Sequence, residues 1–127
     1  MNATERAQDC YGRSAVYMKS PRDTEYEAIA RISHRLRNTA ERRFEQFVPF
    51  IEALNDNAKL WTTLASEVAQ SDNSLPMDLR ARIFWLGEFV TSETQKILRE
   101  NGHGDIEILI EINAAILQGL KSVEAST

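Results

Sequence analysis

The sequence predicts an all-α protein, a single domain that folds as an antiparallel bundle of four to five helices. Apolar residues recur at spacings of three and four along most of the chain, which is the period of an amphipathic helix. Only five Gly and three Pro occur among the 127 residues, and no alternating Val/Ile/Thr-rich run bounded by turn residues is present. Because 43% of the residues are hydrophobic, the chain can bury one shared core.

The predicted domain comprises an arm, a bundle and a tail. Residues 1–18 form an N-terminal arm or a short helix, residues 19–122 form the bundle, and residues 123–127 form a frayed tail. The first bundle helix is expected to start at "SPR", where Ser20 can cap free N–H groups and Pro21 fits the first helical position. Its inward stripe comprises Tyr26, Ile29, Ile32, Ser33 and Leu36.

The second helix is expected to start with Asn38 or Thr39 as its N-cap. Its apolar face begins with Phe44, Phe47, Val48, Ile51 and Leu54. After "NDN" at residues 55–57, the apolar set rotates to Leu60, Trp61, Leu64, Ala65 and Val68. Because Pro49 lacks an N–H and the polar triplet interrupts the face, we expect a bent helix or two shorter helices here.

Turn signals bound the last two helices. The run "QSDNSLP" at residues 70–76 predicts a loop, in which Asn73 or Ser74 is the N-cap and Pro76 starts the third helix. That helix carries an apolar stripe of Leu79, Ile83, Leu86, Val90 and Ile97. It is expected to end near "NGHGD", where Gly102 can take the left-handed conformation, and Asp105 should cap the last helix.

Asn113 is a polar residue near the middle of the apolar arc of the last helix. Burying a carboxamide without partners costs roughly 1–3 kcal/mol, so this side chain should have hydrogen-bond partners. Two interpretations stay open. In the first, Asn113 bonds frayed backbone groups near residues 55–57; in the second, it lies in a groove and binds the backbone of another protein.

The sequence contains no motif for catalysis or for a cofactor. Cys10 is the only cysteine, and no phosphate-binding Gly-rich loop, nucleophile elbow or HExxH is present. His103, Glu107 and Glu111 are a weak metal candidate, and a solvated helix face accounts better for them. We therefore expect no enzymatic activity, no cofactor and no metal.

The charge and the hydropathy of the chain disfavour nucleic acid and membranes as partners. The formal net charge is −4, which disfavours nucleic acid, although a basic cluster is present at Arg31, Arg35, Arg37, Arg42 and Arg43. Glu41 and Glu45 are interspersed in that cluster and favour an ordinary solvated surface over an RNA or phosphate site. No apolar run approaches the roughly 20 residues that span a bilayer, and the N-terminus lacks the apolar stretch of a signal peptide. We expect a cytoplasmic protein with no membrane insertion.

Several large apolar residues fall outside the predicted inward stripes. Phe84 shares its helix face with Arg80 and Glu88, and an apolar residue misplaced in this way often marks an interface. The predicted partner-binding residues are Leu60, Trp61, Leu64, Phe84, Trp85 and Phe89, together with Asn113.

Taken in order, these segments resemble the FlaF family of small helical flagellar-biosynthesis regulators. The matching elements are Ser20-Pro21-Arg22 followed by Glu25, Asn57 with Leu60-Trp61, "NSLP" at residues 73–76 followed by Leu79-Arg80, and "LIEIN" at residues 109–113 with Gly119-Leu120. The chain differs from the family pattern at Ala58 and Ala114, where basic residues are common.

The resemblance implies a cytoplasmic accessory protein, without catalysis, that promotes flagellin production or export alongside the translational regulator FlbT. Our first hypothesis is a secretion chaperone whose partner is flagellin, because disordered apolar segments need cover before assembly. The alternatives are an adaptor that binds only FlbT and an RNA-linked post-transcriptional regulator of flagellin expression.

Overall fold

The computed structural model describes residues 21–125 of the chain. The predicted N-terminal arm and the N-cap at Ser20 lie outside the described residues. Within them are four helices: α3 (Pro21–Glu41), α4 (Phe47–Val68), α5 (Met77–Arg99) and α6 (Ile106–Ala125). The last helix thus extends beyond residue 122, where the bundle was expected to end.

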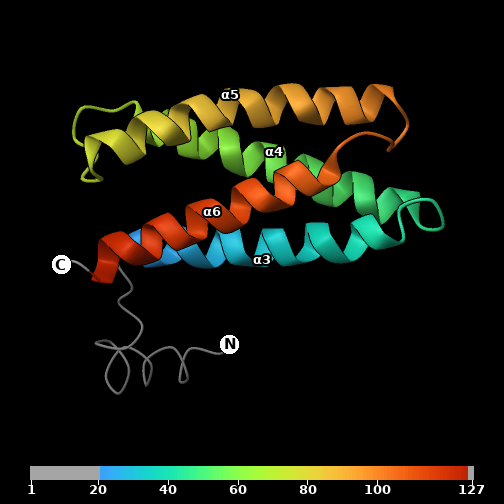
Figure 1. The fold of residues 1–127 in the computed structure, drawn as a ribbon, viewed down its shortest axis with the longest axis horizontal. Coiled ribbons are helices and arrows are strands. Elements are labelled where there is room, and N and C mark those ends of the chain that lie inside the picture. Colours follow the sequence, from blue (N-terminus) through green and yellow to red (C-terminus); the bar gives the residue numbers. More distant parts are fainter. Residues whose placement is uncertain (1–20, 126–127) are drawn as a thin grey trace, which may run out of the picture.

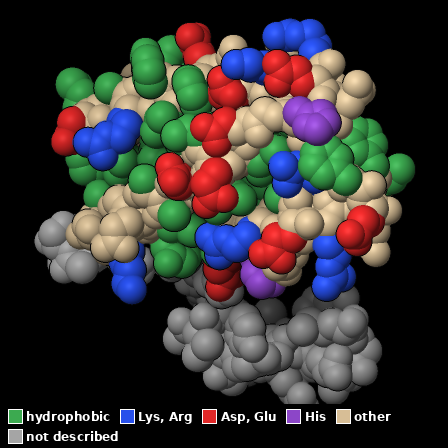
Figure 2. Space-filling view, turned by 45° about the vertical axis from the view of Figure 1, so that its right-hand side comes forward, with side chains coloured by type: hydrophobic (Ala, Val, Ile, Leu, Met, Phe, Trp, Pro, Cys, Tyr) green, Lys and Arg blue, Asp and Glu red, His purple; other side chains and the backbone are tan. Residues whose placement is uncertain are grey.

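Successive helices run in opposite directions and form an up-down-up-down bundle (Figure 1). Helix α3 packs against α4 and α6, and α5 packs against the same two helices. Helices α4 and α6 are therefore diagonal to each other across the core. The predicted all-α antiparallel bundle is confirmed. On the outside, acidic and basic side chains are interspersed with hydrophobic ones (Figure 2).

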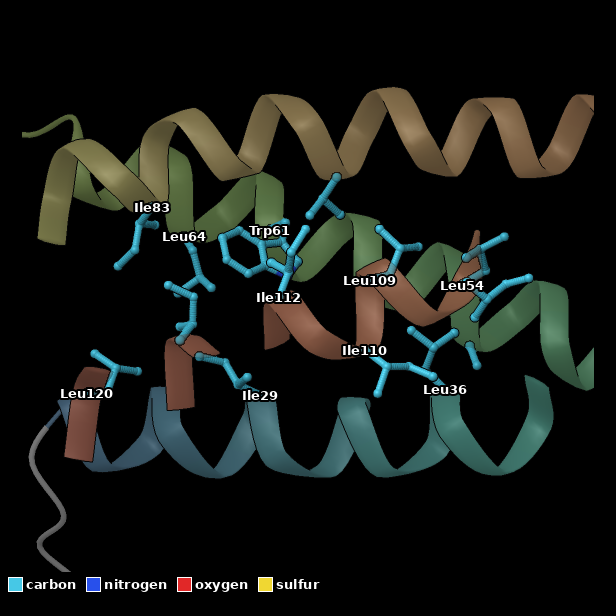
Figure 3. Close-up of a cluster of buried hydrophobic side chains, with 14 of the residues drawn as sticks. Ile29, Leu36, Leu54, Trp61, Leu64, Ile83, Leu109, Ile110, Ile112 and Leu120 are labelled. Carbon is cyan, nitrogen blue, oxygen red and sulfur yellow. The ribbon is translucent and has the colours of Figure 1, made fainter. Parts of the chain in front are cut away.

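All four helices contribute to one apolar core (Figure 3). Trp61 is its largest side chain and is fully buried. Around it lie aliphatic residues from each helix: Ile29, Leu36, Leu54, Leu64, Ile83, Leu109, Ile112 and Leu120. Each buried side chain of this size contributes about 1.5–3 kcal/mol relative to an exposed one, so this layer is the main stabilising feature of the fold.

The first helix ends later than the sequence predicts. Thr39 lies inside α3, where its hydroxyl donates to the carbonyl oxygens of Arg35 at 2.8 Å and Leu36 at 3.2 Å. A hydroxyl bonded to its own helix leaves the helix free to continue, so the prediction that Asn38 or Thr39 is an N-cap is wrong. Residues 42–46 form the turn, and α4 begins at Phe47 after Gln46, which makes no side-chain cap.

Helix α4 is continuous, so the predicted division into two shorter helices is wrong. Because the helix starts at Phe47, Pro49 falls in the first turn, where the N–H has no acceptor within the helix. Asn57 points into the core instead of interrupting it. The buried face is a single stripe of Phe50, Ala53, Leu54, Asn57, Trp61, Leu64 and Val68.

The start of α5 differs from the prediction, whereas the turn from α5 into α6 follows it. Helix α5 starts at Met77, one residue later than predicted, and its N-cap is Pro76. The prediction of Asn73 or Ser74 as the N-cap is therefore wrong, and Asn73 instead shapes the loop by accepting from the N–H of Leu75 at 3.0 Å. Gly102 has φ +90° and donates its N–H to Ile97 at 2.9 Å, which confirms the left-handed helix end. Asp105 caps α6 by accepting from the N–H of Ile108 at 3.1 Å, also as predicted.

Candidate functional site

The two asparagines of the core form a hydrogen-bonded cluster with Trp61. The indole Nε1 of Trp61 donates to Asn113 Oδ1 at 2.7 Å, and Asn113 Nδ2 donates to Asn57 Oδ1 at 2.7 Å. All three side chains are fully buried. Asn113 therefore has the hydrogen-bond partners that the sequence requires, but they are side chains of the diagonal helix α4 and not frayed backbone groups.

This cluster places three of the predicted partner-binding residues inside the bundle. Trp61 and Asn113 have no exposed surface, and Leu64 is only 4% exposed. The prediction that they line a binding groove is therefore wrong for the folded chain. Leu64 was expected in the groove because it faces away from the predicted stripe of Phe44 to Leu54. That stripe is wrong at its start, where Phe44, Phe47 and Val48 are exposed while Phe50 is buried.

The other four candidates lie on two separate surfaces. Leu60 is half-buried and lines a hollow between α3 and α4, together with Ile32 and Asp56. Phe84 and Trp85 lie on α5 and are 47% and 66% exposed. Phe89 is half-buried and stacks against Trp85, with ring centroids 6.3 Å apart and an interplanar angle of 12°. The seven predicted residues thus do not form one groove.

Phe84 joins two hollows on the outer seam between α4 and α5, which we name the α4–α5 groove. The first hollow has a volume of about 390 Å³ and is lined by Thr62, Ala65, Phe84, Gly87, Glu88, Thr91, Ser92 and Gln95. The second, of about 350 Å³, is lined by Val68, Ala69, Met77, Arg80, Ala81, Phe84 and Trp85. The groove thus combines large exposed apolar side chains with small ones.

Small residues determine the shape of this groove because they let the two helices approach closely. A Cβ atom added to Gly87 would lie 2.9 Å from the Cβ of Ala65 and 3.4 Å from the carbonyl oxygen of Trp61. The seam therefore has a shallow floor of small side chains, and Phe84 and Trp85 project from α5 beside it. An apolar side chain of a partner could reach this floor without moving either helix.

Met77 is a groove residue that the sequence reasoning missed. It is 79% exposed and precedes Ala81 by four residues and Phe84 by seven, so the three share one face of α5. That spacing is visible in the sequence. Met77 lies outside the inward stripe of this helix, which begins at Leu79.

Arg80 shows how the wall of the second hollow is built. Its Nε and Nη2 donate to the carbonyl oxygen of Val68 at 3.0 and 2.9 Å, and Nη2 also donates to that of Gln70 at 2.6 Å. These carbonyl groups lie at the C-terminal end of α4, where a helix leaves acceptors unsatisfied. Arg80 thereby ties the start of α5 to the end of α4.

The opposite end of the bundle holds a second apolar surface. Phe44 is 58% exposed and Val48 66% exposed. The Arg43 guanidinium lies 4.6 Å from the Phe44 ring centroid and donates to the Gly102 carbonyl oxygen at 3.0 Å. His103 packs on the same ring, with centroids 4.8 Å apart. Figure 2 shows hydrophobic side chains gathered beside a histidine at this end.

The structure also bears on the basic cluster and the metal candidates. Arg35 donates to Asp56 at 2.6 Å, and Arg43 is held by the loop contacts just described, so two members of the basic cluster are engaged by the protein itself. Among residues 21–125, no three His, Cys, Asp or Glu side chains are grouped so that they could hold a metal ion. No helix in this part of the chain is long and apolar enough to cross a bilayer.

Comparison with known proteins identifies the family. A family model described as "Flagellar protein FlaF" matches residues 7–120, nearly the whole chain. The chain belongs to the FlaF family. The match includes every residue of the α4–α5 groove and of the Trp61 cluster, and it confirms the resemblance in the sequence. Searches of curated proteins and of solved structures gave no match to this FlaF-family chain.

Proposed function

We propose that this protein is a secretion chaperone for flagellin, acting in the cytoplasm and without catalysis. The observation that carries the proposal is the α4–α5 groove, where Met77, Phe84 and Trp85 are exposed together on a member of a flagellar family. Exposed apolar surface of this kind, rimmed by polar residues, is typical of protein interaction sites.

The chemistry of the groove suits a partner that is apolar and not yet folded. Before assembly, the terminal segments of flagellin are expected to be disordered and apolar, so covering them would prevent aggregation and premature contacts. Trp and Tyr, with Arg, are the residues that most often dominate interface energetics, and Trp85 offers such an anchor with Phe89 stacked behind it. Release at the export site requires only moderate affinity, which is usual when a segment folds on binding.

The test is isothermal titration calorimetry of the full chain against unpolymerised flagellin. We expect micromolar binding to the wild-type protein, and Phe84→Ala and Trp85→Ala should each weaken it about tenfold or more, as is usual for truncation of a central apolar anchor. Val48→Ala is the matched control, because Val48 is 66% exposed but lies at the opposite end of the bundle. Its affinity should match that of the wild type.

A parallel titration against FlbT separates the chaperone from its rival. An adaptor would bind FlbT and leave flagellin untouched, and that outcome would replace the present proposal. An RNA-linked regulator would instead lose affinity for its RNA steeply and log-linearly with salt.

A further inference from the structure

We infer that the α4–α5 groove takes an amphipathic helix with a basic residue opposite Glu88, one turn from the apolar side chain that covers Phe84. The inference rests on the proposed function, because it specifies which kind of flagellin segment the groove accepts. It adds two properties that the proposed function leaves open: the secondary structure of the bound segment and its charge.

The bound segment should be a helix because the groove offers no continuous row of free backbone groups to pair with. Its walls are the helices α4 and α5, whose backbone N–H and C=O groups bond within each helix except at the helix ends, and the described residues contain no strand edge. An extended segment lying there would leave half or more of its own backbone groups without protein partners. A helix satisfies these groups internally and presents apolar residues three and four apart, which is the pattern for binding in a groove between helices.

Three polar side chains that line the first hollow with Phe84 can act there only as hydrogen-bond acceptors: Thr62, Glu88 and Thr91. Thr62 donates its hydroxyl hydrogen to the carbonyl oxygen of Ala58 at 3.0 Å, and Thr91 donates to that of Gly87 at 2.9 Å. Both hydroxyls therefore offer the groove only lone pairs and a methyl group. Glu88 is acceptor-only when ionised. A partner side chain with several donors matches these three groups better than one with acceptors, and Ser92 and Gln95 beside them can accept as well as donate.

The charge of the groove also favours a basic residue on the bound helix. Glu88 is exposed on the face of α5 that also bears Phe84, four residues earlier, and it makes no ion pair among residues 21–125. Arg80 is the one basic residue lining the groove, and its guanidinium is engaged with carbonyl groups at the negative C-terminal end of α4. Glu88 is therefore the uncompensated charge, and Lys or Arg on the bound helix is its complement.

The experiment compares charge variants at Glu88 with the same changes at Glu111. Glu111 is exposed on α6, and it does not line the groove. Wild type, Glu88→Gln, Glu88→Lys, Glu111→Gln and Glu111→Lys are titrated with unpolymerised flagellin by calorimetry at low and at physiological salt. Circular dichroism of each mixture is compared with the sum of its separate components.

We expect Glu88→Gln to weaken binding about two- to fivefold, which is the range for one exposed ion pair. Glu88→Lys should weaken it about tenfold or more, because a like charge replaces an attraction. The differences should shrink at higher salt, and the mixture with wild type should be more helical than the sum of its components.

Two results would overturn the inference while leaving the chaperone in place: Glu88 variants that bind as the Glu111 variants do, or binding without any gain in helix. Failure of the wild-type protein to bind flagellin would instead overturn the proposed function itself.

Discussion

Asn113 shows how much one side chain can depend on its neighbours. Its carboxamide accepts from Trp61 and donates to Asn57, so it joins two groups of the diagonal helix that have no solvent contact. Asn57 Nδ2 is buried without a hydrogen-bond partner in the described part of the chain, so the cluster is already short of acceptors. Replacing Asn113 alone takes a hydrogen-bond partner from both Trp61 and Asn57, whereas replacing all three polar side chains leaves no polar group of the cluster unpaired.

Asn113→Leu should therefore destabilise the bundle by about 1–3 kcal/mol, despite the added apolar contact, because it leaves the Trp61 Nε1–H and the Asn57 carboxamide unpaired. Urea unfolding followed by circular dichroism measures this change. The triple variant Asn57→Leu/Trp61→Phe/Asn113→Leu should regain most of the loss. If it is less stable than Asn113→Leu alone, the polar cluster contributes more than the pairing of its own atoms.

Gly87 and Gly119 both lie within helices, but the space around them differs. Gly87 faces α4 at a distance that leaves no room for a methyl group, whereas a Cβ on Gly119 of α6 would make ordinary contact with Leu79 Cδ1 at 3.5 Å. Both positions would gain helix propensity from alanine, by about 1 kcal/mol. Any difference between the two substitutions therefore reports the packing of α4 against α5.

Gly119→Ala should raise the free energy of unfolding by about 0.5–1 kcal/mol. Gly87→Ala should lower it by about 1–3 kcal/mol, because the new methyl group meets the Cβ of Ala65 and must separate the helices. Thermal unfolding of the pair checks both signs. Equal stabilisation by the two variants would show that the seam can widen without cost.

Gly102, in the turn between α5 and α6, has a backbone conformation that favours glycine. Gly102 has φ +90°, and a Cβ there would lie 3.0 Å from Phe47 Cε1. Gly102→Ala should cost about 1–3 kcal/mol, because an L-residue is strained in this conformation. A Gly102→Asn variant, which tolerates positive φ better, should lose less stability than Gly102→Ala if backbone strain dominates.

Local chemistry explains which elements could be predicted from the sequence. Gly102 and Asp105 act within a few residues of their own positions, so the end of α5 and the start of α6 follow from sequence alone. The end of α3 depends instead on the hydrogen bond of the Thr39 hydroxyl. A threonine hydroxyl can accept from an N–H of the following turn as an N-cap, or donate to a carbonyl oxygen of the preceding turn within a helix, as it does here. Because this boundary was placed too early, the first part of the predicted apolar face included Phe44, Phe47 and Val48, which are exposed, and left out Phe50, which is buried.

The candidate site also contains features that follow from local sequence and features that depend on contacts between helices. Phe84 and Trp85 could be predicted to be exposed because the inward stripe of α5 was right. The side-chain partners of Asn113, Trp61 and Asn57, depend on which helix lies diagonally across the core, and periodicity along one helix carries no information about that. The small-residue floor at Ala65 and Gly87 also appears only when α4 and α5 are paired.

For the whole molecule, substitutions of the groove residues should change surface binding without changing the free energy of unfolding much. Phe84→Ser/Trp85→Ser should change the free energy of unfolding by less than about 1 kcal/mol, since both side chains are exposed and each surface substitution is usually worth within about 0.5 kcal/mol. Binding of a hydrophobic dye to the folded protein should fall at the same time. A large loss of stability would show that these side chains belong to the core.

The two tryptophans stand at opposite extremes of solvation, one with no exposed surface and one 66% exposed beside the groove. Their fluorescence should therefore divide into two components: blue-shifted emission from Trp61, which iodide cannot quench, and red-shifted emission from Trp85, which it can. A ligand settling over Phe84 would shield the second and leave the first unchanged, whereas unfolding would expose both. The protein thus carries its own optical means of telling occupancy from denaturation, without any added label.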